Sequence, residues 1–242
     1  MSVLVLGARS DIGRAIARAY AAEGHAVQLA ARDAQTLEAD RADMALRHGV
    51  EVTLHEFDAL DYDSHDAFID GLPDLPDTVV CAVGYMGTQE ESEADMVRAR
   101  LVLRSNFEGP ANMLGLLASR FETRGRGTLI GISSVAGDRG RATNYVYGSA
   151  KAGFTAYLSG LRNRLAGKGV HVMTVKPGFV ATKMTEGMDL PEKLTTDPDT
   201  LARRVLRAAR AGRNTIYVKR VWALVMLIIR NIPEAIFKKL RI

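Results

Sequence analysis

The protein has 242 residues, of which 47% are hydrophobic and 25% charged, a globular composition that excludes a disordered chain, collagen and a disulfide scaffold. The single cysteine, Cys81, excludes an internal disulfide and a cysteine-based zinc site, and it fits a reducing compartment. The net charge is +4, but residues 213–242 hold seven Lys and Arg residues against one acid, so residues 1–212 carry −2 and lack the basic footprint of a nucleic-acid binder.

The chain opens directly on an apolar run without a cleavable leader, so we expect a cytoplasmic protein rather than a secreted one. From there, apolar runs typical of buried strands alternate with stretches of helical spacing. In chain order the predicted elements begin with a strand at 3–6, a helix at 11–23, a strand at 26–30, a helix at 37–46, a strand at 50–54 and a strand at 78–83. A helical stretch at 92–121, broken near Gly109-Pro110, leads to a strand at 127–132 and a helix at 145–165. The last predicted elements are a strand at 170–175, a helix at 201–209 and a strand at 215–218.

This alternation predicts an α/β fold with a doubly wound, seven-stranded parallel sheet and helices on both faces. We expect one domain over residues 1–218, because no linker or repeat interrupts it. Ligands of such folds bind at the carboxyl ends of the strands, near the point where the strand order reverses.

The turn after the first strand is a candidate phosphate site. Gly7 and Gly13 let the backbone approach a pyrophosphate, and the following helix offers free N–H groups at its N-terminus. Arg9 and Ser10 are placed to add contacts. A plain glycine turn between strand and helix is the alternative.

The ends of the second and third strands bear on the choice of cofactor. Ala31 stands where NAD enzymes of this architecture carry an acid, and Arg32, which follows it, suits a 2′-phosphate. We therefore expect NADP(H), with NAD(H) as the alternative if Arg32 is only a solvated residue. Asp58 is placed to accept a bond from the adenine amino group, unless it only forms a turn.

Four residues of the second half are candidates for the chemistry. Tyr147 and Lys151 lie four apart in the predicted helix, so they share one face, where the ammonium favours the phenolate and the tyrosine can exchange a proton with a carbonyl or an alcohol. Ser134, at the end of the fifth predicted strand, is placed to hold the substrate oxygen. Asn106 would bend its helix and hold a water near Lys151, or else it only marks a helix break.

Together these residues resemble the short-chain dehydrogenase/reductase family, in its compact branch with a Rossmann fold. The resemblance runs from the glycine turn to residues 176–182 and implies that Tyr147 is the acid/base, helped by Lys151, which also binds the nicotinamide ribose. It implies that Ser134 orients the carbonyl and that Asn106 supports a proton relay. Its implied cofactor contacts are Gly7, Arg9, Ser10, Ile12, Gly13, Arg32, Asp58, Ala82, Val83, Gly84, Tyr147, Lys151, Pro177, Gly178, Val180 and Thr182.

Two positions depart from the family pattern. Asp11 replaces the usual middle glycine of the first turn, and its charge repels a pyrophosphate unless the side chain turns away, for instance to cap the helix. Cys81-Ala82-Val83-Gly84 replaces Asn-Asn-Ala-Gly after the fourth strand, so the structural bond of that asparagine is replaced or lost.

A narrower resemblance points to a substrate. Segments 57–61, 64–65, 146–149 and 232–240 are similar to the reductases of this family that act on decaprenylphosphoryl-2-keto-ribose, a keto-sugar carried on a polyprenyl phosphate. Residues 182–195 are expected to form the lid over the substrate.

Residues 219–242 form a basic, amphipathic extension. Nine apolar residues at 221–229 lie between Arg220 and Arg230, too few to span a bilayer. Apolar residues bracketed by cations favour a helix lying in the interface of an anionic membrane. Packing on the same domain, or at the interface of an expected homo-oligomer, is the alternative.

We therefore expect an enzyme that reduces a ketone to a secondary alcohol with NAD(P)H, on a hydrophobic or lipid-linked substrate such as a polyprenyl-phosphoryl 2-keto-sugar. Two alternatives stay open: a 3-oxoacyl-thioester reductase, whose acidic carrier would dock on the basic patch, and a non-catalytic nucleotide sensor. The five histidines show no ligand spacing, so we expect no metal site, and we expect no nucleic-acid partner.

Overall fold

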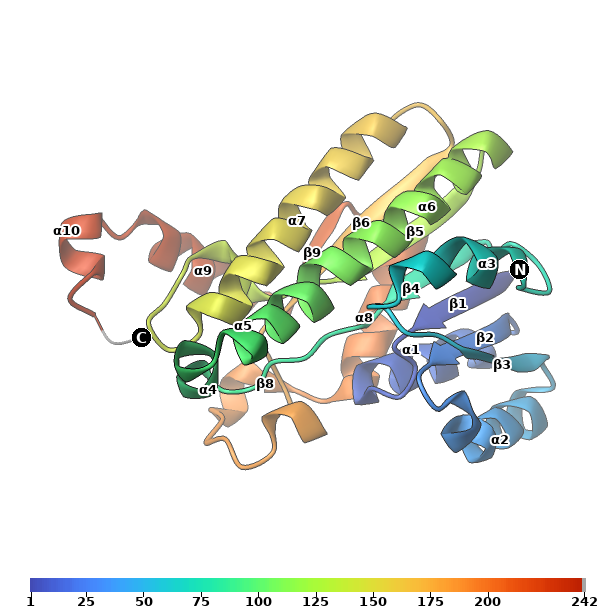
Figure 1. Ribbon diagram of the computed structural model, residues 1–242, viewed down its shortest axis with the longest axis horizontal. Helices are drawn as coiled ribbons and strands as arrows, with labels where there is room; N and C mark the ends of the chain where they lie inside the picture. Colours follow the sequence, from blue (N-terminus) through green and yellow to red (C-terminus); the bar gives the residue numbers. More distant parts are fainter. Residues whose placement is uncertain (241–242) are drawn as a thin grey trace.

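The computed structural model describes residues 1–240 and shows a parallel sheet covered by helices on both faces (Figure 1). Its seven strands are β1 (Ser2–Leu6), β2 (Ala26–Ala31), β3 (Val52–Glu56), β4 (Thr78–Cys81), β5 (Gly127–Ile132), β6 (Val170–Pro177) and β9 (Thr215–Val218). They lie in the order β3-β2-β1-β4-β5-β6-β9. The predicted doubly wound α/β class is confirmed, and the strand order reverses between β1 and β4.

Both faces of the sheet are buried, which explains why its strands are apolar throughout. In β1, Val3 and Val5 face one hydrophobic core while Leu4 and Leu6 face the other, because successive side chains of a strand alternate between faces. Burial of each such side chain contributes about 1.5–3 kcal/mol. One core is covered by α1 (Asp11–Ala22), α2 (Glu38–His48) and α8 (Pro198–Arg210), the other by α3 (His65–Asp70), α6 (Gly109–Arg124) and α7 (Tyr145–Leu165).

The long helical stretch before β5 is divided differently from the prediction. It consists of α4 (Gln89–Ala94), α5 (Met96–Leu103), a π-helical segment (Arg104–Glu108) and α6. The predicted break near Gly109-Pro110 takes the form of this π-helical segment, in which the Gly109 N–H bonds to the carbonyl of Arg104. Pro110 has no N–H for the carbonyl four residues before it, which belongs to Asn106.

A small second sheet was not predicted. It pairs β7 (Phe179–Val180) with β8 (Thr195–Thr196) and thereby closes the base of the segment 181–194, which holds most of the expected lid at 182–195.

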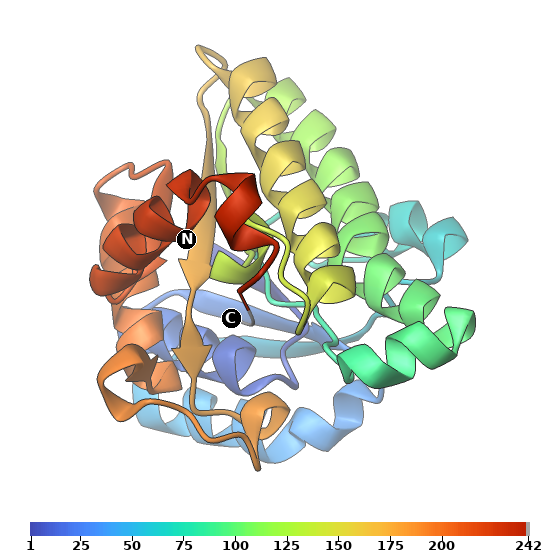
Figure 2. The ribbon, with the colours of Figure 1, turned by 90° about the vertical axis from the view of Figure 1, so that its left-hand side faces the viewer.

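The extension after β9 forms α9 (Val221–Asn231) and α10 (Glu234–Phe237), while its residues 241 and 242 lie outside the described residues. Trp222 and Met226 of α9 are buried against Val135. Arg139 donates 2.6 Å hydrogen bonds to the carbonyls of Ile229 and Ile232 and also pairs with Glu234 at the start of α10. The extension therefore packs on the body of the domain, on the same side as the lid segment (Figure 2). Within residues 1–240, no helix combines the length and apolar character needed to cross a bilayer.

Candidate active site

Two cavities meet at the carboxyl ends of the strands. One extends toward Ser134, Tyr147 and Lys151, and the other extends toward the ends of β2 and β3. The residues that line both cavities are Arg9, Ser10, Ala82, Val83, Gly84 and Lys183. The cavities thus form one groove across the point where the strand order reverses, where a dinucleotide is expected to bind.

The predicted phosphate turn lies at the junction of the two cavities. Gly7 has a φ of +80°, and a Cβ there would lie 2.8 Å from the Val83 nitrogen, so the turn can pack on the end of β4 only as glycine. A Cβ on Gly13 would lie 2.6 Å from the carbonyl oxygen of Gly7. The turn therefore brings the N-terminus of α1 against the groove, a geometry that fits a pyrophosphate.

The cap of α1 differs from the expectation for Asp11. Ser10 is the N-cap: its Oγ accepts the Gly13 N–H at 3.0 Å and donates to the Gly7 carbonyl at 2.8 Å. The suggestion that Asp11 caps the helix is wrong, because its carboxylate instead accepts the backbone N–H of Lys183 at 2.8 Å. Asp11 therefore turns toward the lid segment and joins it to the phosphate turn.

The adenosine side of the groove is basic. Its walls include the side chains of Arg9, Arg14, Arg32 and Arg98, and Asp58 is the acid among them. Arg9 donates to the carbonyl of Arg32 at 3.0 Å and pairs with Asp33 at 2.8 Å. Arg9 and Arg32, both predicted cofactor contacts, therefore lie side by side at the end of β2. This charge suits a 2′-phosphate.

Asp58 lines the same cavity, where its Oδ1 accepts the Leu60 N–H at 2.9 Å. One carboxylate oxygen of Asp58 therefore stabilises a turn, which was the alternative role expected from the sequence. The contact with adenine stays a prediction.

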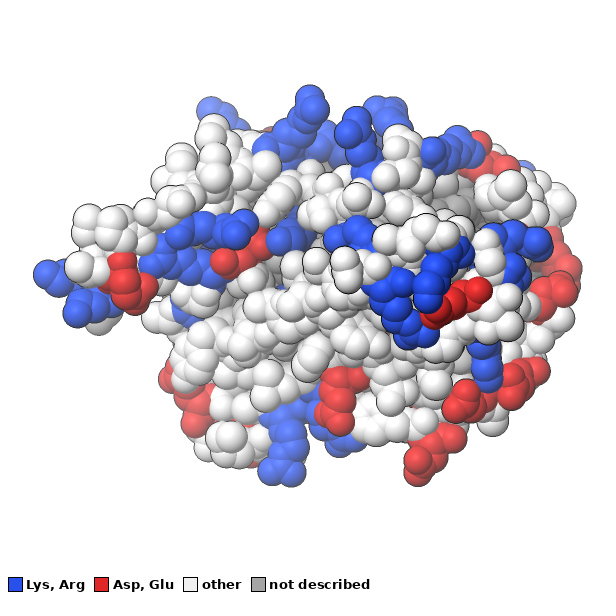
Figure 3. Space-filling view, turned by 90° about the horizontal axis from the view of Figure 1, so that it is seen from above, with Lys and Arg blue, Asp and Glu red and all other residues white. Residues whose placement is uncertain are grey.

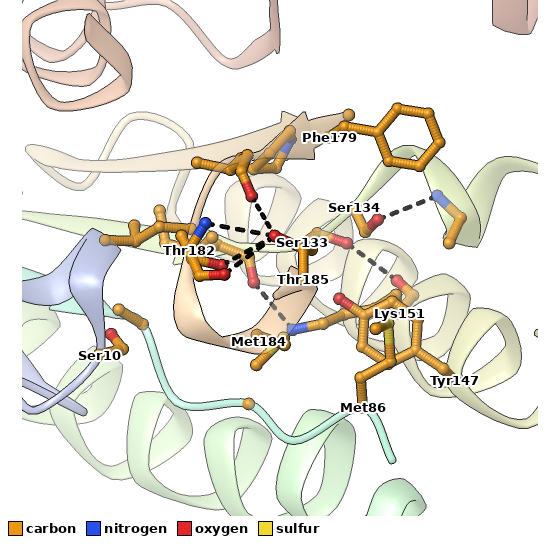
Figure 4. Close-up of a pocket in the computed structure, with 18 of the residues that line it drawn as sticks. Ser10, Met86, Ser133, Ser134, Tyr147, Lys151, Phe179, Thr182, Met184 and Thr185 are labelled. Atoms are coloured by element: carbon orange, nitrogen blue, oxygen red, sulfur yellow. Dashed lines mark hydrogen bonds between the residues drawn. The ribbon is translucent and has the colours of Figure 1, made fainter. Parts of the chain in front are cut away.

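Ser134, Tyr147 and Lys151 lie together in the other cavity (Figure 4). Ser134 lies two residues after β5 and caps the 3₁₀ turn Val135–Asp138: its Oγ accepts the Ala136 N–H at 3.0 Å, and its hydroxyl lies beside the Tyr147 phenol. Lys151 donates to the Ile132 carbonyl at 3.1 Å, and its Nζ lies 5.7 Å from the centroid of the Tyr147 ring. The structure therefore brings together three of the four residues predicted to carry the chemistry.

Burial determines the proton affinities of this pair. Burial raises the pKa of Tyr147 to about 12, although the hydrogen bond from the Ser134 hydroxyl acts in the opposite direction. Burial also lowers the pKa of Lys151 to about 8. The tyrosine pKa is therefore raised in the protein alone because desolvation of the phenol is its largest cause, and the expected effect of Lys151 stays a prediction. At neutral pH the phenol is protonated and the amine is mostly charged, as a proton donor and its electrostatic support must be.

Asn106, the fourth candidate, lies behind Lys151 in the π-helical segment and is fully buried. Its Nδ2 donates to the carbonyls of Val102 and Tyr85, and its Oδ1 accepts the Tyr85 N–H at 3.3 Å. A Cβ on Gly84 would lie 2.9 Å from the Asn106 Oδ1 and 3.5 Å from the Lys151 Nζ. Asn106 and Lys151 therefore meet over Gly84, and the water expected between them stays a prediction.

The unusual segment after β4 is held by its backbone. The Ala82 N–H donates to the Leu6 carbonyl at 2.8 Å, which keeps the end of β4 beside β1 without an asparagine side chain. Burial raises the pKa of the Cys81 thiol to about 11, so this cysteine is a packing residue.

The predicted loop at 176–182 forms the roof of the cavity. Pro177, Gly178, Val180 and Thr182 all line it. A Cβ on Gly178 would lie 1.9 Å from the indole nitrogen of Trp222, which itself donates to the Leu194 carbonyl at 3.0 Å. The roof, the lid and the extension are therefore joined at this glycine.

Sequence reasoning missed two supports of the site. The Ser133 Oγ donates to the Lys151 carbonyl at 3.0 Å and lies 2.7 Å from the Thr155 hydroxyl, which fixes α7 on β5. Asp138 forms a buried ion pair with Lys176 and accepts a 2.7 Å hydrogen bond from Tyr217. A serine doublet at a strand end is a weak sequence signal for the first support, and the second joins residues too far apart in sequence to give one. Within the described part of the chain, no group of three or more His, Cys, Asp or Glu side chains is arranged to hold a metal.

Comparisons with known proteins agree with this geometry. A family model described as short chain dehydrogenase matches residues 1–193. An uncharacterized oxidoreductase of Mycobacterium tuberculosis is 36% identical over 243 residues, which is 98% of this chain and 96% of that protein. An uncharacterized oxidoreductase of Streptomyces coelicolor is 38% identical over 245 residues, 99% of this chain and 95% of that protein. The chain belongs to the short-chain dehydrogenase family.

A solved structure shares the fold of this short-chain dehydrogenase. It is a short-chain dehydrogenase from Sphingobium yanoikuyae in complex with NADPH, with a TM-score of 0.83 and 22% identity, covering 97% of this chain and 98% of that one. The short-chain dehydrogenase described here is an oxidoreductase that acts on CH–OH groups and interconverts alcohols and ketones with NAD(P)(H). The names of the two relatives state no substrate.

Proposed function

We propose that this short-chain dehydrogenase reduces a ketone to a secondary alcohol, with Tyr147 as the proton donor. The observation that supports this most strongly is the convergence of Ser134, Tyr147 and Lys151 at one end of a groove shaped for a dinucleotide. The protonated phenol favours reduction, because that direction consumes a proton.

In this mechanism the chain positions the ketone and supplies the proton. Bound NADPH would supply the hydride. The Ser134 Oγ accepts the Ala136 N–H, and its hydroxyl proton, which faces the Tyr147 phenol, would bond the ketone oxygen when the substrate enters. The Tyr147 O–H bond breaks as its proton moves to that oxygen, and the Lys151 ammonium stabilises the phenolate that remains. We propose that a water near Asn106 and Lys151 returns a proton from solvent.

The cofactor we propose is NADP(H), with NAD(H) as the alternative. Arg9, Arg14 and Arg32 line the adenosine side of the groove, and this basic lining favours a 2′-phosphate over a hydroxyl.

The proposed substrate is hydrophobic or lipid-linked, such as a polyprenyl-phosphoryl 2-keto-sugar. Met86, Met184 and Met188 line the cavity beside the catalytic residues, and Met184 and Met188 are half exposed on the lid. Unbranched, flexible methionines adapt to long apolar groups. The narrower sequence resemblance supports the same choice.

The extension supports peripheral contact with the inner face of an anionic membrane, for a protein we still propose to be cytoplasmic and homo-oligomeric. Leu224, Leu227 and Ile228 of α9 are each about 60% exposed, opposite the buried face that carries Trp222 and Met226. In Figure 3 the extension is the left-hand end of the molecule, where basic side chains border uncharged surface. An apolar stripe with a basic border suits an anionic lipid surface.

The test is oxidation of NADPH and, separately, NADH by the purified protein with a panel of ketones, with and without anionic vesicles. The panel includes a short polyprenyl-phosphoryl keto-sugar and a 3-oxoacyl thioester. We expect turnover of the lipid-linked sugar, increased by vesicles and lost in Tyr147→Phe. Turnover of the thioester alone, unchanged by vesicles, would contradict the lipid-linked substrate, and a protein that binds NADPH but reduces no ketone would be the sensor.

A further inference from the structure

The loop between Ser134 and α7 places an unpaired cation in the wall of the substrate cavity. Arg141 lies in this loop, lines the cavity that holds Tyr147 and is half-buried. Its Nε is buried without a hydrogen-bond partner, and among residues 1–240 it forms no ion pair with a carboxylate. Its neighbour Arg139 is fully engaged with the extension, so the loop carries one satisfied guanidinium and one unsatisfied one.

Asn144 in the same loop shows a second unsatisfied group. It is the N-cap residue of α7, yet its side chain makes no capping hydrogen bond. Its Oδ1 is buried without a partner, and the residue lines the same cavity as Arg141. Asparagine at a helix N-cap normally bonds the first turn of its helix, so this side chain is available to a ligand instead.

Arg141 is half-buried, and its desolvated Nε has no hydrogen-bond partner, which costs free energy that a bound group could recover. Burial lowers the pKa of Arg141, and no acidic side chain opposes that shift. Asp11 is the acidic residue that lines this cavity, but its carboxylate accepts the backbone N–H of Lys183. The missing partner of Arg141 is therefore an anion that enters the cavity.

The cofactor's phosphates do not account for this anion. Arg9 and Ser10 of the phosphate turn line this cavity too, whereas Arg14, Arg32 and Arg98 line only the adenosine side of the groove, which Arg141 does not line. Arg141 follows β5, which is separated from β1 by β4, and it shares its loop with the catalytic serine. It therefore lies on the substrate side of the groove.

We infer that Arg141 and Asn144 form an anion subsite in the substrate cavity, and that the ketone carries a phosphate ester or carboxylate with a hydroxyl group beside it. Arg141 would bind the anion through its guanidinium fork, and the Asn144 Oδ1 would accept the hydroxyl proton. That the bound anion belongs to a ketone substrate rests on the proposed function. Binding of an anion at the subsite can be tested without turnover.

The binding test measures the thermal stability of the protein saturated with NADP+, so that the cofactor's own phosphate sites are filled. Inorganic phosphate and acetate are added separately. We expect at least one of these anions to raise the Tm of the native protein, and we expect Arg141→Gln to abolish that rise while Arg207→Gln, a matched exposed arginine on α8, retains it. Phosphate as the effective anion would identify a phosphate ester, and acetate a carboxylate. No rise in the native protein, or an equal rise in Arg141→Gln, would overturn the subsite.

The kinetic test compares an anionic ketone with its neutral ester. Loss of a charge-assisted hydrogen bond predicts that Arg141→Gln raises KM for the anionic ketone about 10- to 100-fold. KM for the neutral ester should change less than about threefold, and Arg141→Lys should recover part of the loss. Equal losses on both ketones, or a large fall in the Tm of the ligand-free variant, would show that Arg141 has a structural role instead. If neither ketone is turned over while the anion still stabilises the native protein, the proposed function fails and the subsite stands.

Discussion

At the scale of single residues, burial governs the chemistry of this site more than the charges of neighbouring groups do. The sequence places Lys151 one helical turn from Tyr147, and from that spacing the ammonium is expected to ease removal of the phenolic proton. In the folded chain both groups are desolvated, so each favours its neutral form. Spacing alone predicted the pair, whereas the direction of the tyrosine shift needed the packing around it.

The stability of the protein should reveal this desolvation. The pKa of Lys151 is about 8 when folded and 10.5 as its ordinary value, so between these pH values the unfolded chain binds more protons and stability rises with pH. Lys151→Met removes this term. The test measures the unfolding free energies of the native protein and of Lys151→Met with urea at pH 7, 8.5 and 10. From pH 7 to pH 10, the unfolding free energy of the native protein should rise by about 2 kcal/mol more than that of the variant. A constant difference between the two proteins would contradict the depressed pKa.

Gly84 should be intolerant of a methyl group although its backbone is unstrained. A Cβ there would press on Asn106 and approach Lys151, so Gly84→Ala should cost about 1–3 kcal/mol of stability and lower turnover at least tenfold. Gly140→Ala is the matched control, because a Cβ at Gly140 meets nothing within 4 Å, and it should change stability by less than about 0.5 kcal/mol. Urea unfolding and NADPH oxidation measure both effects, and equal behaviour of the two variants would refute the close approach.

At the scale of elements, the apolar runs predicted all seven strands of the main sheet because both faces of that sheet are buried. The third strand begins two residues later than predicted, at Val52, since an apolar residue at position 50 extends the run without joining the sheet. The short helix α3 and the pair β7 and β8 escaped prediction, because elements of two to six residues are held by tertiary contacts rather than by local pattern. The same holds for the catalytic site: its residues carry family signals, while Asp138 and Lys176 are joined only by the fold.

That ion pair should be the main support of the segment after Ser134. Asp138 occupies the 3₁₀ turn Val135–Asp138, so it anchors this turn to β6 and β9. Asp138→Asn would leave Lys176 as a buried charge without a counter-ion, which predicts a loss of about 3–5 kcal/mol. Tyr217→Phe removes only the neutral partner and should cost about 1 kcal/mol. Unfolding curves of the two variants decide the point, and equal losses would show that the Lys176 charge is compensated elsewhere.

At the scale of the whole molecule, the fold brings the residues predicted to contact phosphate, ribose and carbonyl groups from distant segments to one groove. The arginines at the adenosine end predict that NADPH stabilises the protein more than NADH at equal concentration. At a hundredfold excess over its Kd a ligand adds about 2.7 kcal/mol, which corresponds to a rise in Tm of about 5–10 °C for a domain of this size. Arg32→Ala should reduce the NADPH effect and leave the NADH effect unchanged. Equal stabilisation of the native protein by both nucleotides would contradict the NADP(H) assignment.

The extension and the lid give the molecule a second organising feature beside the groove. Trp222 ties α9 to the lid, and Arg139 ties the C-terminal residues to the loop that carries Arg141. The cavity, the lid and the exposed apolar stripe are therefore parts of one connected region, which suits the large, anionic, partly apolar ketone that we propose.

The measurement that tests the central claim most directly is the transfer of deuterium from NADPH that carries deuterium at both C4 positions of the nicotinamide to the carbinol carbon of the product. The native protein should yield an alcohol carrying one deuterium, detected by mass spectrometry, when given a ketone from the panel. Tyr147→Phe should still bind the labelled NADPH and form labelled alcohol at least a hundredfold more slowly. An alcohol without deuterium, or equal rates for the two proteins, would contradict ketone reduction with Tyr147 as the proton donor.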